Sequence, residues 1–115
     1  MTNYYSKNEA YNIANTIWQQ LGGQRFSVMT GVKPVCYGER DGKVYLMMHV
    51  GRNKNNINFF EVLYNAAKDL YEICFIRKRG VEAHTIAKYD DVYCDMLETI
   101  FTQYTGLVTS FKRAS

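Results

Sequence analysis

Apolar residues recur at helical spacing near the start of the chain. Ser6 and Glu9 stand three residues apart, the spacing of a capping box in which each side chain bonds the other residue's backbone N–H. The apolar positions that follow are Ala10, Ile13, Ala14, Ile17 and Leu21. Gly22 and Gly23 end the pattern. The sequence therefore predicts a helix over residues 6–21.

The middle of the chain changes to alternating apolar and polar positions, which is typical of β-strands. Residues 25–30 are predicted as a strand that ends at Gly31. A hairpin follows, with arms at residues 34–38 and 43–50 around the turn 39–42, whose Asp-Gly pair suits a turn of positive φ. In the second arm the residues predicted to face the core are Val44, Leu46, Met48 and Val50.

A second hairpin is predicted after the run 51–56, which has two cations, three asparagines and no apolar residue and should be an exposed loop. Its arms are residues 57–64 and 70–78, which are rich in aromatic and β-branched residues. A helix across residues 59–70 is the competing interpretation. A further strand is predicted at residues 82–88, after the break at Gly80.

The last apolar pattern predicts a closing helix. Asp90 or Asp91 is placed to cap it, and Gly106 to end it. Its apolar stripe is Tyr93, Met96, Leu97, Ile100, Phe101 and Tyr104. Residues 1–5 and 108–115 are expected to fray. The predicted fold is a single α+β domain over residues 1–115, mainly an antiparallel meander of about five strands with N- and C-terminal helices packed on one face.

Three motifs within residues 16–107 carry a resemblance. They are Gln-Leu-Gly-Gly at 20–23 with Phe26 and Met-Thr-Gly-Val-Lys at 29–33, Asp-Leu-Tyr at 69–71 with Phe75, and Asp-Val-Tyr-Cys-Asp-Met-Leu at 91–97 with Phe101 and Thr-Gly-Leu at 105–107. Together they resemble small uncharacterised proteins from phages and mobile elements of gut and other low-GC bacteria. The resemblance implies that setting and supplies no catalytic residues.

Composition narrows the class of protein. At 115 residues and 47% hydrophobic the chain suits one domain. No stretch approaches the roughly 20 apolar residues of a membrane helix, and residues 1–7 lack a signal-peptide core. We therefore expect a soluble protein in the cytoplasm of a bacterial host cell, with no membrane partner. Cys36, Cys74 and Cys94 sit singly in apolar runs, which favours reduced core thiols over reactive or paired cysteines.

Positive charge is densest at Arg77-Lys78-Arg79, in a chain of net charge +3. Alternation along a strand would place Arg77 and Arg79 on one face and Lys78 on the other. The candidate nucleic-acid-binding residues are Arg52, Lys54, Arg77, Lys78, Arg79 and Lys88, to which Lys112 and Arg113 could add. A solvated strand end would account for the same cluster, and both interpretations stay open.

Tyrosine is abundant, at ten residues. Tyr37, Tyr45, Tyr64 and Tyr71 are predicted on the sheet face left open by the helices, where they would stack on bases or anchor a partner protein. Half-buried packing between strands is the alternative.

Signals for chemistry are weak. Residues 29–33 could form an anion-binding turn, but P-loop spacing is lacking and a simple bend is favoured. Neither histidine, His49 or His84, has a neighbouring ligand at metal spacing. The acidic residues that suggest a metal site fit helix capping better, and they are Asp90, Asp91 and Asp95. No GxSxG, HExxH, DxDxDG or GxxxxGKS pattern occurs, so we predict no catalytic residue, metal or cofactor.

These observations predict a non-catalytic accessory protein of a phage or mobile element that binds nucleic acid or a nucleic-acid-processing complex. The alternative is a protein-binding inhibitor of a host enzyme that defends against phages. A third hypothesis is a homo-oligomeric structural protein, in which the open sheet face or an edge strand pairs in a homodimer.

Overall fold

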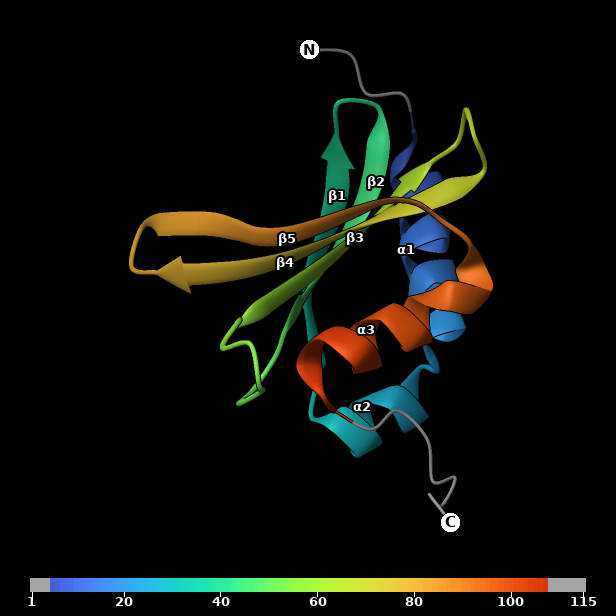
Figure 1. Ribbon diagram of the computed structural model, residues 1–115. Coiled ribbons are helices and arrows are strands. Elements are labelled where there is room, and N and C mark those ends of the chain that lie inside the picture. Colours follow the sequence, from blue (N-terminus) through green and yellow to red (C-terminus); the bar gives the residue numbers. More distant parts are fainter. Residues whose placement is uncertain (1–4, 108–115) are drawn as a thin grey trace.

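Five antiparallel strands form one sheet in the computed structural model, which describes residues 5–107 (Figure 1). The strands lie side by side in chain order, and they are β1 (Lys33–Arg40), β2 (Lys43–His49), β3 (Phe59–Asn65), β4 (Leu70–Arg79) and β5 (Glu82–Val92). The helices are α1 (Lys7–Leu21), α2 (Gln24–Thr30), the 3-10 turn η1 (Cys94–Met96) and α3 (Leu97–Thr105). The predicted α+β fold with an antiparallel meander is confirmed. The expected fraying of residues 1–4 and 108–115, and Lys112 and Arg113 with it, lies outside the described residues.

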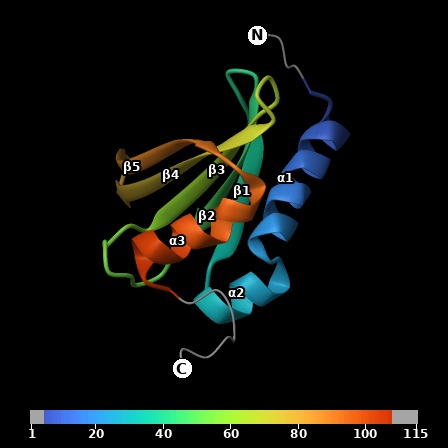
Figure 2. The same cartoon turned by 45° about the vertical axis from the view of Figure 1, so that its right-hand side comes forward.

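The helices cover one face of the sheet and leave the other open (Figure 2). α1 packs along β1 and β2, while the ring contacts of α3 reach β3 and β4. The residues of β2 predicted to face this core are all buried, and they are Val44, Leu46, Met48 and the following Val50. The alternation of apolar and polar residues therefore predicted the orientation of this strand correctly.

The first helix forms as its capping box predicts. The Ser6 hydroxyl accepts the Glu9 N–H at 3.1 Å, and Glu9 Oε1 accepts the Ser6 N–H at 2.9 Å. The bond from the Ser6 backbone, and then that from its hydroxyl, lowers the pKa of Glu9. The orphan amides at the helix start are thereby partly satisfied.

A chain of aromatic rings joins the helices to the sheet. The contacts, given by the distance between ring centroids, are Trp18–Phe26 at 5.8 Å, Phe26–Phe101 at 5.0 Å, Phe101–Phe60 at 4.9 Å, Phe60–Phe75 at 5.3 Å and Phe75–Tyr104 at 4.1 Å. Phe101 is fully buried at its centre. Because the rings come from α1, α2, α3, β3 and β4, they hold all of these elements in one core.

The strand predicted at residues 25–30 is wrong, because these residues form α2. Gly22 and Gly23, with φ of 122° and 59°, turn the chain sharply after α1. The turn lets Phe26 pack against Phe101, and a seven-residue helix buries that one ring only. Apolar residues at positions 26 and 28 looked like strand alternation because the segment is too short to show a helical period.

The start of the last helix is also a correction. Asp90 and Asp91 do not cap it, because β5 runs on to the buried Val92, which pairs with Tyr71. Asp91 has a φ of 54° and forms an ion pair with Lys68 at 3.1 Å. α3 begins only at Leu97, after the turn η1, and no side chain among residues 5–107 caps it.

Both predicted hairpins are confirmed, and the competing helix across residues 59–70 does not form. Asp41 and Gly42, with φ of 54° and 78°, make the tight turn between β1 and β2. The two edge strands are irregular. A bulge lies between Pro34 and Cys36 of β1, and the pairing of β4 with β5 slips twice.

The cysteines divide between buried and exposed positions. Cys74 is buried as predicted, and burial raises the pKa of its thiol. Cys36 and Cys94 are exposed, so their predicted place in the core is wrong. Both lie in segments that leave one side to solvent, the edge strand β1 and the turn η1. No helix within residues 5–107 is long and apolar enough to cross a membrane.

Phe101→Ala should lower the free energy of unfolding by about 3–5 kcal/mol, because it removes the ring that links α2 and α3 to the sheet and leaves a cavity. Urea denaturation followed by circular dichroism measures the change. Val28→Ala, at an α2 position that is 68% exposed, is the control and should change stability by less than about 0.5 kcal/mol. If both substitutions lowered the free energy of unfolding equally, Phe101 would not be the residue that joins the helices to the sheet.

Candidate nucleic-acid interface

One end of the sheet is hollowed between the loop that follows β2 and the last residues of β4. The hollow has a volume of about 320 Å³. Four of its lining residues are predicted nucleic-acid-binding cations, and they are Arg52, Arg77, Lys78 and Arg79. We call this the basic hollow. It brings together residues from two segments that are 25 positions apart in the sequence.

Asn53 folds the loop that carries Arg52. Its Nδ2 donates to the carbonyls of Gly51 and Ile57, each at 2.7 Å. Its Oδ1 accepts the N–H groups of Asn55 at 3.2 Å and Ile57 at 3.3 Å. One side chain therefore replaces the regular hydrogen bonds that this loop lacks, and the predicted exposed loop is ordered around it.

The same loop is fastened to the end of α3. The Lys54 N–H donates to the Thr105 carbonyl at 3.1 Å, and the Asn55 side chain donates to the Tyr104 carbonyl. Carbonyls in the last turn of a helix have no partner within the helix, so they are available for these bonds. Lys54 is thus held at α3 and is not among the residues that line the basic hollow.

Asn58 fixes the other wall. Its Nδ2 donates to the Lys78 carbonyl and its Oδ1 accepts the Lys78 N–H, both at 2.7 Å. Its own N–H donates to the Ile76 carbonyl at 3.1 Å. The side chain extends the pairing of β3 with β4 by one more step and holds the cationic end of β4 in place. Sequence reasoning missed this role, since an asparagine just before a strand resembles part of the loop.

Within residues 5–107, the cations of the basic hollow lack carboxylate partners. No ion pair of this part of the chain joins an Asp or Glu to Arg52, Arg77, Lys78 or Arg79. Unpaired cations that share a hollow repel one another, and an anion placed between them would relieve that repulsion.

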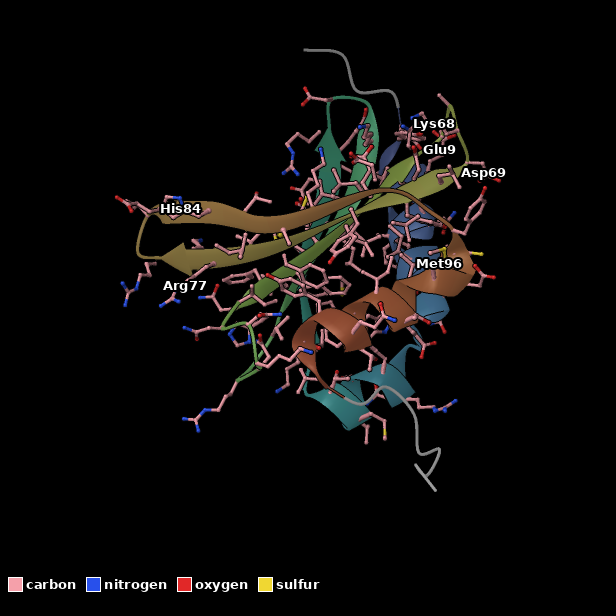
Figure 3. The ribbon with its side chains drawn as sticks, in the orientation of Figure 1. Glu9, Lys68, Asp69, Arg77, His84 and Met96 are labelled. Carbon is pink, nitrogen blue, oxygen red and sulfur yellow. The ribbon has the colours of Figure 1, made fainter. Side chains whose placement is uncertain are left out.

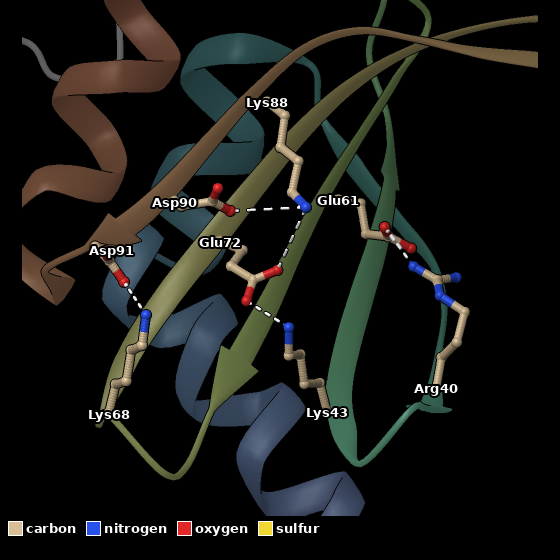
Figure 4. Close-up of polar contacts among 8 residues, drawn as sticks. All are labelled: Arg40, Lys43, Glu61, Lys68, Glu72, Lys88, Asp90 and Asp91. Atoms are coloured by element: carbon tan, nitrogen blue, oxygen red, sulfur yellow. Dashed lines mark hydrogen bonds and ion pairs between the residues drawn. The ribbon is translucent and has the colours of Figure 1, made fainter.

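Arg40, Lys43 and Lys88 are paired with carboxylates on the open sheet face (Figure 4). Arg40 bonds the buried Glu61 at 2.7 Å, and Lys43 bonds the buried Glu72 at 2.6 Å. The bond to Glu72 raises the pKa of Lys43. Lys88 lies 4.0 Å from Glu72 and 3.7 Å from Asp90. Lys88 therefore stands with these carboxylates and does not line the basic hollow.

Cations reach both sides of the sheet at this end. Arg77 and Arg79 follow the core residue Phe75 at alternate positions, so they lie on the helix side, and Figure 3 shows Arg77 near the end of β4. Lys78 lies on the open side, with its Nζ 5.8 Å from the centre of the Phe59 ring. The His49 ring meets the same phenyl ring edge-on at 5.5 Å.

Three of the four candidate tyrosines lie on the helix side, so their predicted place on the open face is wrong. Tyr37 pairs with Leu46 of β2, Tyr64 pairs with Val44, and Tyr71 pairs with Tyr64. Residues directly opposite in a sheet share a face, and Leu46 and Val44 face the core. Tyr45 alone of the four is on the open face, where its ring centre lies 4.8 Å from the Arg40 guanidinium carbon.

Tyr64 and Tyr71 serve the packing between α1 and the sheet. The Tyr64 hydroxyl donates to Asp69 Oδ1 at 2.6 Å, and this bond raises the pKa of Tyr64 to about 12. Tyr71 is 7% exposed, and burial raises its pKa. Both line a hollow of about 270 Å³ beside Gln20 of α1. Tyr37 differs, because it is 44% exposed and meets Tyr11 of α1 edge-on at 5.8 Å.

Neither of the weaker candidate sites forms within residues 5–107. In the segment 29–33 the Gly31 N–H donates to the Ser27 carbonyl at 2.8 Å, and the Val32 N–H donates to the Thr30 hydroxyl at 3.1 Å. Those amides are used by the end of α2 and do not point to an anion. Among the described residues no three His, Cys, Asp or Glu side chains gather as a metal site.

Comparison of the chain with protein-family models, curated proteins and solved structures found no match.

Asn58→Ala should free the cationic end of β4, because two hydrogen bonds to the Lys78 backbone are lost. We expect a loss of about 1–2 kcal/mol in the free energy of unfolding and faster hydrogen exchange at the Lys78 amide, measured by NMR. Asn12→Ala, at an exposed position of α1, is the matched control and should leave that amide unchanged. Unaltered exchange of the Lys78 amide in the Asn58 variant would show that the hydrogen bonds of Asn58 do not hold the end of β4 in place.

Proposed function

We propose that the protein binds nucleic acid through its phosphates, which the basic hollow holds, and that it has no catalytic role. One observation supports this most directly: four cations from two distant segments line one hollow without a carboxylate partner among the described residues. On the open sheet face, by contrast, Arg40, Lys43 and Lys88 have carboxylate partners. Binding of a polyanion at the hollow would release counterions and give affinity that falls with salt.

The chemistry of the hollow suits phosphate. Guanidinium groups of Arg52, Arg77 and Arg79 offer paired N–H donors that match phosphate oxygens, and Lys78 adds a compact charge. His49 and Asn56 also line the hollow and can add hydrogen-bond donors. The feature that these residues share is positive charge, which carries no sequence information, so the proposal is for contact with the backbone.

The biological setting is part of the proposal. The motif resemblance to phage and mobile-element proteins suggests an accessory that works on nucleic acid or beside a complex that processes it. A fold that holds a loop and a strand end together over several side-chain bonds is suited to binding, because a preformed site loses little entropy when the ligand docks.

Arg77→Ala with Arg79→Ala should weaken binding to labelled single- and double-stranded DNA and RNA. Since two phosphate contacts are lost, the slope of log K against log salt should become shallower by roughly 1.4–1.8. Fluorescence anisotropy at a series of salt concentrations measures both the affinity and the slope. These side chains are beyond the part of β4 that packs in the core, so the fold should persist.

The matched control removes the same charge elsewhere. Lys7→Ala with Arg25→Ala takes away two exposed cations on α1 and α2 and should leave the slope nearly unchanged. Equal weakening in the two double variants would indicate general charge attraction and contradict a site at the hollow. Absent binding to every nucleic acid at low salt would overturn the proposal.

A second candidate function is inhibition of a host defence enzyme by protein contact. A different surface favours it: an apolar groove of about 160 Å³ between α1 and β1. Its walls include Trp18, Pro34 and Leu46, and its rim carries Tyr11 and Tyr37, which are 54% and 44% exposed. Amphipathic tyrosines around an apolar groove are common anchors for a partner protein.

On this second proposal Tyr37→Ala should abolish recovery of a stoichiometric partner in a pulldown from host lysate. Tyr45→Ala removes the same type of side chain from the opposite sheet face and should leave recovery intact. If Tyr45→Ala alone abolished recovery, the partner would contact the open face, and the proposal of binding at the groove would be wrong.

A further inference from the structure

The β4–β5 hairpin projects beyond the rest of the sheet (Figure 1). β4 and β5 are ten and eleven residues long, whereas β3 has seven. The pairing of β3 with β4 begins at Phe59 and Ile76, so residues 77–79 of β4 have strand partners only in β5. The end of the hairpin is therefore a two-stranded ribbon that extends from the basic hollow.

The tip of this ribbon is apolar. Gly80, with a φ of 58°, and Val81 join Arg79 to Glu82 in a two-residue turn. A glycine at the first turn position meets the steric demand of such a tight connection. Val81 is 99% exposed. A single exposed apolar residue is ordinary, but this one stands at the most advanced point of a cationic ribbon.

The charge on the ribbon is mostly positive. β4 contributes Arg77, Lys78 and Arg79, which alternate between the two ribbon faces. β5 contributes one carboxylate, Glu82, which lies 3.5 Å from Nε2 of His84. Arg77 and His84 are paired across the ribbon, and Figure 3 shows both on the projecting hairpin. A polyanion would therefore meet cations whichever ribbon face it approached.

The width of the ribbon favours one class of nucleic acid. Paired strands are about 4.8 Å apart, and with side chains a two-stranded ribbon fits the B-DNA major groove, which is about 12 Å wide. The major groove of A-form RNA is too narrow and deep for it. Base edges in the B-DNA groove include the thymine methyl group, to which an apolar side chain is complementary.

We propose that the ribbon enters the major groove of double-stranded DNA, with Val81 against the base edges and the basic hollow at its root on the phosphates. This inference rests on the proposed function and specifies its partner. Val81 at the tip of the ribbon reaches the bases, whereas the cations of the hollow, with Arg77, Lys78 and Arg79 of the ribbon among them, contact the backbone. The two contacts therefore respond to different substitutions.

The test compares Val81→Ser with the wild-type chain on a short DNA duplex that contains guanines. We expect binding about threefold to tenfold weaker, because an apolar contact is lost, with an unchanged salt slope, because no charge is removed. Val28→Ser, on α2 and 68% exposed, makes the same chemical change away from the ribbon and should bind like wild type. The wild-type protein should also protect guanine N7, a major-groove atom, from methylation by dimethyl sulfate.

The outcomes separate this inference from the proposed function. The groove contact is overturned if Val81→Ser binds the duplex as tightly as wild type. It is also overturned if guanine N7 stays unprotected. Either result leaves the proposal of phosphate binding intact. Binding to single strands without binding to the duplex has the same meaning. If the wild-type chain binds no nucleic acid at all, both proposals are overturned together.

Discussion

The position of Phe101 is the constraint on which the rest of the structure depends. Its ring meets Phe26 of α2 and Phe60 of β3, so it sets where α3 crosses the sheet. That crossing brings the last carbonyls of α3 to the loop that follows β2, whose backbone and side chains bond them. A contact in the middle of the core thus helps to place the loop that carries Arg52, although Arg52 itself is exposed. The basic hollow is an outcome of core packing as much as of surface charge.

The distribution of ion pairs explains why a chain of modest net charge has one strongly basic end. The open sheet face buries Glu61 and Glu72 between strands, and buried carboxylates need nearby cations because desolvation is costly. Arg40, Lys43 and Lys88 meet that need. The cations at residues 77–79 lie beyond both buried carboxylates, so they are not needed to neutralise a buried charge.

Long elements could be predicted because they carry a readable period, as the alternation over residues 43–50 does. The predictions that were wrong concern residues whose conformation depends on tertiary contacts. Phe26 lies in a helix because it packs on Phe101, a partner that no local pattern reveals. The cations of β4 are adjacent in the sequence, so their clustering was evident, but the approach of Arg52 depends on the bonds of Asn53. Three candidate tyrosines were misplaced, since register between strands is set by turns and bulges that a local pattern does not determine.

The irregular edges of the sheet limit how the protein can recognise anything. Proteins often bind peptides by adding a strand to a free edge, which requires a regular row of backbone donors and acceptors. Here Pro34 and the adjacent bulge interrupt β1, and two register slips interrupt the pairing that shapes β5. Addition of a partner's strand is therefore disfavoured at both edges of the sheet. Growth of the sheet into fibrous aggregates is disfavoured for the same reason. Recognition is left to side chains and turns, whose identity can change in evolution without disturbing the hydrogen-bonded frame beneath them.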